Sequence, residues 1–263
     1  MMARQHVTFA VGVAGTALAT TAYFSDAVET WVTEHWPNAL LMLLLIAGGA
    51  LVPDIDHHSS TITKRLGWLG AILHGFIRLF GIRHRGFFHS IFFAALSGLT
   101  FWGITALLNV TQWAAIFLGL LFLFYASVTF AFLFGSVGRN PVLILALAVA
   151  LFFGVERGVI TADGNWLAIG AFAGPLLHSA GDMLTRGKVT FFAPFSTRGM
   201  AAPLGFATGG ILESVVLRVV FFVWSLAMIA WVVLMGTGRL APVDFTADQW
   251  WSQAMPYLLW RLA

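Results

Sequence analysis

Long apolar runs separated by short polar segments dominate the chain. A helix that crosses a bilayer needs about 20 residues, or fewer where the bilayer thins locally. The runs predict seven spans, at Val7–Phe24, Ala39–Val52, Phe87–Val110, Trp113–Phe134, Val142–Val155, Trp166–Leu184 and Ile211–Met235. The expected fold class is therefore all-α, a polytopic transmembrane helical bundle.

Segment Thr61–Phe80 has a different pattern, with polar and apolar residues on opposite sides of a helix. The polar side carries Lys64, Arg65, His74 and Arg78, and the apolar side carries Ile62, Leu66, Leu69, Leu73 and Ile77. Such a segment is typical of an amphipathic helix that lies in the membrane interface.

Composition supports an integral membrane protein. The 263 residues are 59% hydrophobic and only 10% charged, whereas an average soluble domain carries about 25% charge. The mean hydropathy is +0.88. We expect one membrane-embedded domain over residues 1–263. The chain has no cysteine, which excludes disulfides and thiolate chemistry, so any metal must be held by nitrogen and oxygen.

Three clusters of ionisable residues interrupt the apolar runs, at Pro53–His58, His84–Ser90 and His178–Asp182. Ionisable groups are costly near a bilayer core and usually mark a functional site there. Seven spans bring the clusters to one membrane face: His6 opens the first span, Asp54 closes the second, His84 opens the third and Asp182 closes the sixth. We therefore expect a single shared site.

The distribution of basic residues indicates which face this is. Most of the 14 lysines and arginines fall on the cluster face, namely Arg4, Lys64, Arg65, Arg78, Arg83, Arg85, Arg139, Arg186, Lys188, Arg198 and Arg218. The positive-inside rule makes that face cytoplasmic. The tail at Gln249–Trp260 is aromatic-rich and is expected in the outer interface.

The spacing of the candidate ligands points to a metal. His178 and Asp182 are four residues apart, so they stack on one helix face and can ligate one ion; an intrahelical hydrogen bond is the alternative. Asp54 and Asp56 follow Pro53 and would point the same way in an extended turn, although acids at a helix end often only face water. The predicted metal ligands are His6, Asp54, Asp56, His57, His84, His89, His178 and Asp182.

Three residues are candidates for catalytic roles: Asp56, Arg85 and Glu213. Arg85 offers a forked donor that matches phosphate or carboxylate, or it is a cytoplasmic arginine with no such role. Gly86 would let the chain turn and bring His84 toward His89. Glu213 would act as a general base or outer-shell acid, or would pair with Arg218. His35, His58 and His74 are not expected in the site.

These motifs resemble the YdjM-like family of bacterial inner-membrane proteins, for which metal-dependent hydrolase activity is suggested and some of which are regulated by LexA. The resemblance rests on Pro53–His57, on His84-Arg85-Gly86 with His89-Ser90, on His178, Asp182, Thr185 and Gly187, and on Pro194-Phe195. Phe88 departs from it, because the family usually has threonine there. The order of His6, Asp54, His89 and His178 with Asp182 is similar to zinc-dependent phospholipase C and P1-type nuclease proteins, which implies phosphoester cleavage.

The leading hypothesis is a hydrolase of the bacterial inner membrane whose site faces the cytoplasm. A metal-activated water would cleave an ester or phosphoester. The expected cofactor is one or two divalent ions, Zn²⁺ first, with Mn²⁺ or Mg²⁺ as alternatives. The expected partners are membrane lipids and a lipid or small anionic phosphoester substrate, and no nucleic acid is expected. The alternatives are a divalent-cation transporter or metal-sensing membrane protein, which the apolar far halves of the spans disfavour, and a structural scaffold.

Overall fold

A computed structural model of the protein describes residues 2–81, 84–107, 112–134, 142, 146–147, 149–150, 153–154, 157–161, 164–203 and 205–240. The expected span Val142–Val155 lies largely outside the described residues, and the tail at Gln249–Trp260 lies wholly outside them. The named elements are α1 Ala3–Phe24, α2 Asp26–Glu34, α3 Trp36–Gly49, η1 Val52–Asp56, α4 Thr61–Leu66, α5 Trp68–Leu79, η2 Phe87–His89, α6 Ile91–Ala106, α7 Gln112–Phe134, α9 Gly164–Met183, η4 Leu212–Leu217 and α10 Arg218–Gly236.

The all-α prediction is confirmed over these residues, which form helices and only two isolated β-bridges. Three helical stretches are long and apolar enough to cross a membrane: Ala3–Phe24, Trp36–Asp56 and Leu212–Gly236. Shorter apolar helices occur at Trp68–Leu79, Ile91–Ala106 and Ile116–Phe130. The full count of seven spans therefore stays a prediction. Helix α2 was not expected from the hydrophobic pattern.

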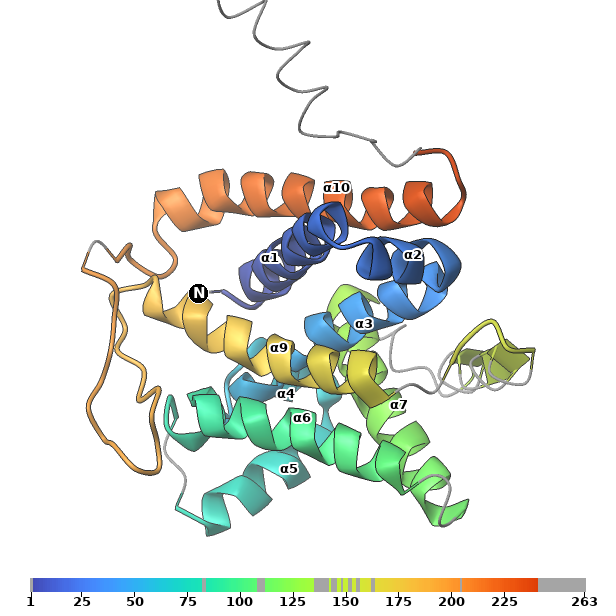
Figure 1. The fold of residues 1–263 in the computed structure, drawn as a ribbon. Helices are drawn as coiled ribbons and strands as arrows, with labels where there is room; N and C mark the ends of the chain where they lie inside the picture. The colour runs from blue at the N-terminus through green and yellow to red at the C-terminus, as the bar shows by residue number, and fades with distance from the viewer. Residues whose placement is uncertain are drawn as a thin grey trace, which may run out of the picture.

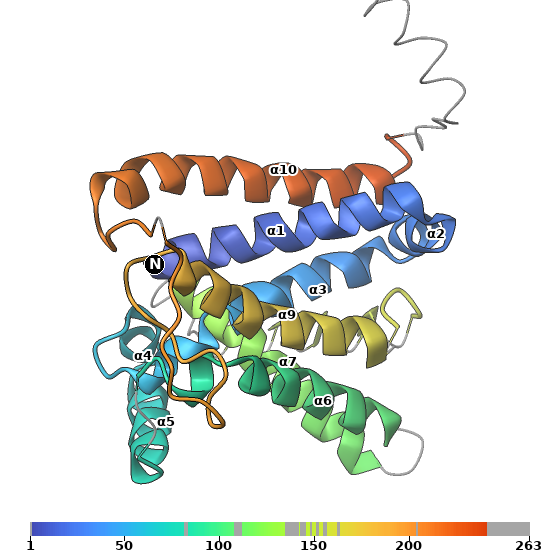
Figure 2. The same cartoon turned by 60° about the vertical axis from the view of Figure 1, so that its left-hand side comes forward.

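Glycines set the closest helix contacts. Helices α1 and α10 lie side by side (Figures 1 and 2), and a Cβ on Gly12 would be 2.7 Å from the ring of Trp224. Where α3 crosses α9, a Cβ on Gly174 would be 2.6 Å from the Cα of Gly49. A larger residue at either position would force its neighbour to move, so glycine permits the close approach of these helices.

The predicted amphipathic helix is two helices. Gly67 separates α4 from α5 and has φ 62°, a left-handed conformation that glycine adopts without a Cβ clash. Ile77 of α5 is buried, as the pattern predicts. Helix α5 also leaves a stripe of large apolar side chains exposed, at Trp68, Ile72, Phe76, Leu79 and Phe80.

The starts of α1 and α6 and the ends of α3 and α9 meet at one end of the bundle (Figure 2). These four helix ends carry the three ionisable clusters and His6. The predicted convergence of the clusters is therefore present in the fold. The segment between α9 and η4 covers the same end, tied to the turn before η2 by hydrogen bonds from Thr190 N and Oγ1 to the carbonyl of Arg85, at 3.2 and 2.8 Å.

Candidate metal centre

The chain carries two carboxylates into the site just beyond the end of α3. Helix α3 ends at Gly49, and η1 follows with Pro53 near its start, a position that suits a residue with fixed φ and no N–H. Because η1 is a 3₁₀ turn rather than an extended one, Asp54 and Asp56 do not point the same way. They contact opposite ring nitrogens of His89, so that part of the prediction is wrong.

His178 and Asp182 lie one turn apart on α9, and His178 Nε2 is 3.8 Å from Asp182 Oδ2. The predicted stacking on one face is confirmed. Their separation is too long for a hydrogen bond. His178 Nδ1 instead lies 2.7 Å from the carbonyl oxygen of Ala50. Since a carbonyl only accepts, Nδ1 carries the proton and Nε2 presents a lone pair to the site.

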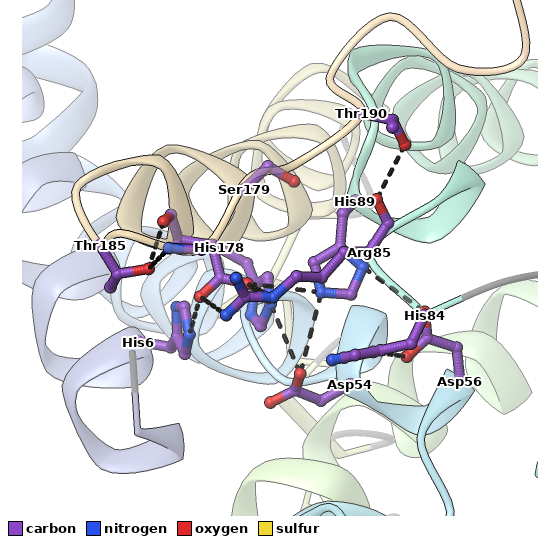
Figure 3. A network of polar contacts seen from close by, with 12 residues as sticks. His6, Asp54, Asp56, His84, Arg85, His89, His178, Ser179, Thr185 and Thr190 are labelled. Carbon is purple, nitrogen blue, oxygen red and sulfur yellow. Dashed lines mark hydrogen bonds and ion pairs between the residues drawn. The ribbon is translucent and has the colours of Figure 1, made fainter. Parts of the chain in front are cut away.

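Asp54, His89, His178 and Asp182, from three segments, bring four ligand atoms close together. The side chains of Asp54, His89 and His178 point toward one another in Figure 3. Asp54 Oδ1 is 3.8 Å from His89 Nε2 and 3.7 Å from His178 Nε2. Asp182 Oδ2 is 3.7 Å from His89 Nε2 and 3.8 Å from His178 Nε2. The four separations between nitrogen and oxygen are nearly equal, and each carboxylate oxygen faces both imidazoles.

This arrangement fits a divalent cation. The Nε2 atoms of His89 and His178 are buried and make no hydrogen bond within the described residues, and a buried polar atom of this kind needs a partner. A tetrahedral Zn²⁺ with bonds of about 2.1 Å holds its ligand atoms about 3.4 Å apart. The observed 3.7–3.8 Å is within a few tenths of an ångström of that spacing. Two imidazoles and two carboxylates are also a donor set that zinc accepts.

Asp56 lies behind the histidines rather than among the four atoms. Its side chain is fully buried, with Oδ1 2.6 Å from His84 Nδ1 and Oδ2 3.5 Å from His89 Nδ1. A carboxylate on the far nitrogen of a ligand histidine fixes the orientation of the ring and increases its basicity. The geometry thus fits Asp56 to positioning His84 and His89.

The histidines outside the membrane-spanning helices differ in their electrostatic surroundings. Partial burial lowers the pKa of His84, but the hydrogen bond to Asp56 and its charge outweigh this and hold that pKa above the usual value. Partial burial lowers the pKa of His57, and the neighbouring imidazoles of His84 and His58 lower it further. The ring of His57 lies tilted beside that of His84, at 4.7 Å between ring centroids, and His57 Nδ1 shares a hydrogen bond with the Ser59 hydroxyl at 2.9 Å.

Two separate sets of ligand atoms could each contribute to an ion. One set is His6, His178 and Asp182, and the other is Asp54, His84 and His89; within each set the atoms lie within 4.8 Å of one another. His6 is buried, its Nε2 is 3.2 Å from Asp182 Oδ1, and its ring stacks on His178 at 3.8 Å. The first helix therefore delivers His6 to the centre, and the two sets leave the number of ions at one or two.

Arg85 lies beside the metal centre, next to Asp182. Its Nε and Nη2 atoms are each 3.4 Å from an oxygen of Asp182, and its side chain is 24% exposed. The left-handed backbone of this turn falls on Arg85, with φ 60°, and not on Gly86, so the role expected of Gly86 was misplaced. A Cβ on Gly187 would lie 1.6 Å from Arg85 Nη1, which means that only glycine leaves room for the guanidinium.

Glu213 is fully buried at the start of η4. Its carboxylate accepts hydrogen bonds from the backbone N–H of Met2 and from that of Gly209, the latter at 2.7 Å. Gln5 Nε2 donates to the carbonyl of Glu213 at 3.2 Å. These bonds fit Glu213 to anchoring the start of α1, the helix that carries His6.

Three features of the centre were not foreseen from the sequence. The carbonyl of Ala50 orients His178, Gly187 makes room for Arg85, and Thr185 Oγ1 bonds to the carbonyl of Asp182 at 2.7 Å. Thr185 and Gly187 stand in the motif after Asp182, which was the available signal. A backbone carbonyl carries no signal in the sequence.

The fold and the centre define a class: a helical membrane protein with clustered histidine and aspartate side chains at one end of its bundle. The chain belongs to the YdjM inner membrane protein family, whose model matches residues 1–241. The suspected resemblance is thereby confirmed. Comparison with curated proteins and with solved structures gives no match.

Proposed function

We propose that the protein is a metal-dependent hydrolase of the inner membrane that cleaves a phosphoester or ester at the cytoplasmic interface. The observation that carries the proposal is the pair of buried Nε2 atoms on His89 and His178. They make no hydrogen bond to any residue that the structure describes, and they face Asp54 and Asp182 at 3.7–3.8 Å. A purely structural cluster would be expected to pair such atoms with donors or acceptors.

The residues present have distinct tasks in this proposal. Asp54, His89, His178 and Asp182 would hold the ion, with His6 and His84 available to complete its coordination or to bind a second ion. An ion in such a site lowers the pKa of water and polarises the scissile group. Asp56 orients the rings of His84 and His89 through their Nδ1 atoms. Arg85 offers its forked N–H groups to an anionic substrate.

The cytoplasmic orientation is supported by charge. Lys64, Arg65, Arg186, Lys188 and Arg198 all lie in segments at the end of the bundle that carries the centre. Cytoplasmic loops of membrane proteins are enriched in such residues.

Metal content is the direct test. Full-length protein is purified in detergent, and its zinc, manganese and iron are measured with Asp54→Asn and Asp182→Asn beside it. Each variant removes one ligand oxygen's charge at nearly constant volume, so affinity for Zn²⁺ is expected to fall more than about 10-fold. Asp26→Asn, at an exposed acid in α2, is the control and should bind like the parent. Equal metal content in all four proteins would overturn the proposal.

Turnover is tested on a panel of phosphomonoesters, phosphodiesters and carboxylic esters with the metal-loaded protein. Hydrolysis that is lost on chelation and restored by added metal supports the proposal. Uptake of Zn²⁺ into proteoliposomes without hydrolysis of any panel member would favour a transporter instead.

A further inference from the structure

We infer that the substrate is an anionic membrane phospholipid, with its head group at the metal centre and one acyl chain in an apolar groove between α5, α6 and α7. The inference rests on the proposed function and names the class of substrate for the same site.

The groove has a volume of about 340 Å³, within the range of pockets that bind small ligands. Its walls come from η1, α5, η2, α6 and α7, and almost all of the lining side chains are apolar. Helix α5 packs mainly on α4 and η1, so the side chains of α5 form a separate wall opposite α6 and α7. A groove with apolar walls on both sides suits a hydrocarbon chain.

The polar groups of the lining need no ligand. Ser97 and Tyr125 bond to each other through their hydroxyls at 2.6 Å, and Thr100 Oγ1 donates to the carbonyl of Leu96 at 2.7 Å. All three hydroxyls in the groove are thus satisfied within the protein. A polar ligand would find no unpaired hydroxyl there, whereas a hydrocarbon needs none.

Part of the groove lining is next in sequence to the metal centre. Ile55 lines the groove and stands between Asp54 and Asp56, and Phe88 lines it immediately before His89. In the inferred complex, the polar end of the bound chain lies on this side of the groove, toward the candidate ligands. Arg85 is the partly exposed cation at that point, and it would pair with the phosphate of a lipid head group.

Part of the groove lining is exposed at the surface. Phe76 on α5 and Leu96 on α6 line it and are 59% and 53% exposed. Phe76 also belongs to the exposed apolar stripe of α5. An interfacial helix with its apolar stripe in the acyl region would place this opening against the lipid tails, so a lipid could enter sideways without leaving the membrane.

Photocrosslinking tests the groove independently of turnover. Full-length protein is placed in nanodiscs of phosphatidylethanolamine and phosphatidylglycerol, a small share of the phosphatidylglycerol carrying a diazirine on one acyl chain. We expect saturable labelling of groove residues on α5, α6 and α7. Leu96→Trp narrows the groove and should reduce that labelling at least about 3-fold. Leu99→Trp is the matched control, because Leu99 is also exposed on α6, at 62% against 53% for Leu96, but does not line the groove.

Labelling of the exposed face of α10 reports ordinary contact with bulk lipid. Equal, non-saturable labelling of α6 and α10, or labelling that Leu96→Trp leaves unchanged, would overturn the inference. Competition by long-chain phosphatidic acid supports it, and equal competition by soluble glycerol phosphate contradicts it.

The two proposals fail in different ways. Saturable labelling of the groove in a protein that binds no metal would leave a lipid site without a hydrolase. Metal-dependent hydrolysis of a soluble phosphoester that Leu96→Trp does not affect, together with no saturable labelling, would leave a hydrolase without an acyl groove.

Discussion

His178 donates a hydrogen bond from Nδ1 to the carbonyl oxygen of Ala50, 2.7 Å away. The bond joins the last turns of α9 to the residue that follows α3, and it fixes which nitrogen of His178 faces Asp54 and Asp182. Orientation of a ligand histidine by a backbone carbonyl is common in metal proteins. The packing of α3 against α9 therefore sets the geometry of the centre.

Gly174→Ala should disturb that packing. Its Cβ would lie 2.6–2.8 Å from backbone atoms of Gly49 and Ile46, so the helices must separate. We expect a loss of about 1–3 kcal/mol in the free energy of unfolding, the usual cost of overpacking, together with weaker metal binding. The measurement is thermal unfolding in detergent beside a zinc competition titration. Gly119→Ala has open space around its Cβ and should leave both unchanged or raise stability slightly.

Asp56→Asn separates an orienting carboxylate from a direct ligand. Asp56 contacts His84 and His89 on their Nδ1 atoms, so the variant should weaken Zn²⁺ binding by about 10–100-fold, the range for groups that orient ligands. Asp54→Asn, measured in the same competition titration, should weaken it more. The reverse order would make Asp56 the ligand and Asp54 the supporting acid.

Helix positions and the meeting of the clusters followed from hydrophobic run length, because each cluster stands at a helix end. Counting helices decides which ends meet, even without knowing how the helices pack. His6 illustrates this. A single histidine does not by itself indicate a metal ligand, but its place at the start of α1 brings its Nε2 to 3.2 Å from Asp182 Oδ1.

Local turns were less predictable, because their conformation depends on contacts distant in sequence. The left-handed turn falls on Arg85, where bonds from Thr190 hold the backbone carbonyl. Likewise, the pattern did not predict the break at Gly67, because a single glycine is compatible with a continuous amphipathic helix. The different surroundings of Asp54 and Asp56 arise from the 3₁₀ turn, which a spacing of two residues does not specify.

Glu213→Gln distinguishes an anchor from a general base. The carboxylate accepts two backbone N–H bonds, from Met2 and Gly209, and losing a charged acceptor should destabilise the fold by about 1–3 kcal/mol. If Glu213 is an anchor, Glu213→Gln lowers the melting temperature and leaves the pH profile of turnover unchanged. Unchanged melting with turnover abolished would instead assign Glu213 to catalysis. Glu34→Gln, at an exposed acid in α2, is the control for the loss of one charge.

The absence of cysteine from the sequence makes the orientation testable by single-cysteine labelling. Thr197 is exposed in the segment after α9, and Thr237 is exposed just past α10. The apolar stretch Leu212–Gly236 lies between them. A membrane-impermeant maleimide applied to intact spheroplasts should label Thr237→Cys, and should label Thr197→Cys only after lysis. The opposite pattern would place the metal centre on the periplasmic side.

Gly187→Ala should reproduce the loss of Arg85 without touching a metal ligand. The added Cβ would overlap Arg85 Nη1 at 1.6 Å and drive the guanidinium away from Asp182. Inorganic phosphate is titrated into metal-loaded full-length protein by calorimetry. We expect Gly187→Ala and Arg85→Ala each to weaken phosphate binding about 10-fold, as loss of a hydrogen bond to a charged group does, with metal content retained.

The double variant should bind phosphate no more weakly than either single variant, because both substitutions act through the same contact. Arg198→Ala, an exposed arginine in the same segment, should bind phosphate like the parent; additive losses in the double variant would show that Gly187 acts on something other than Arg85.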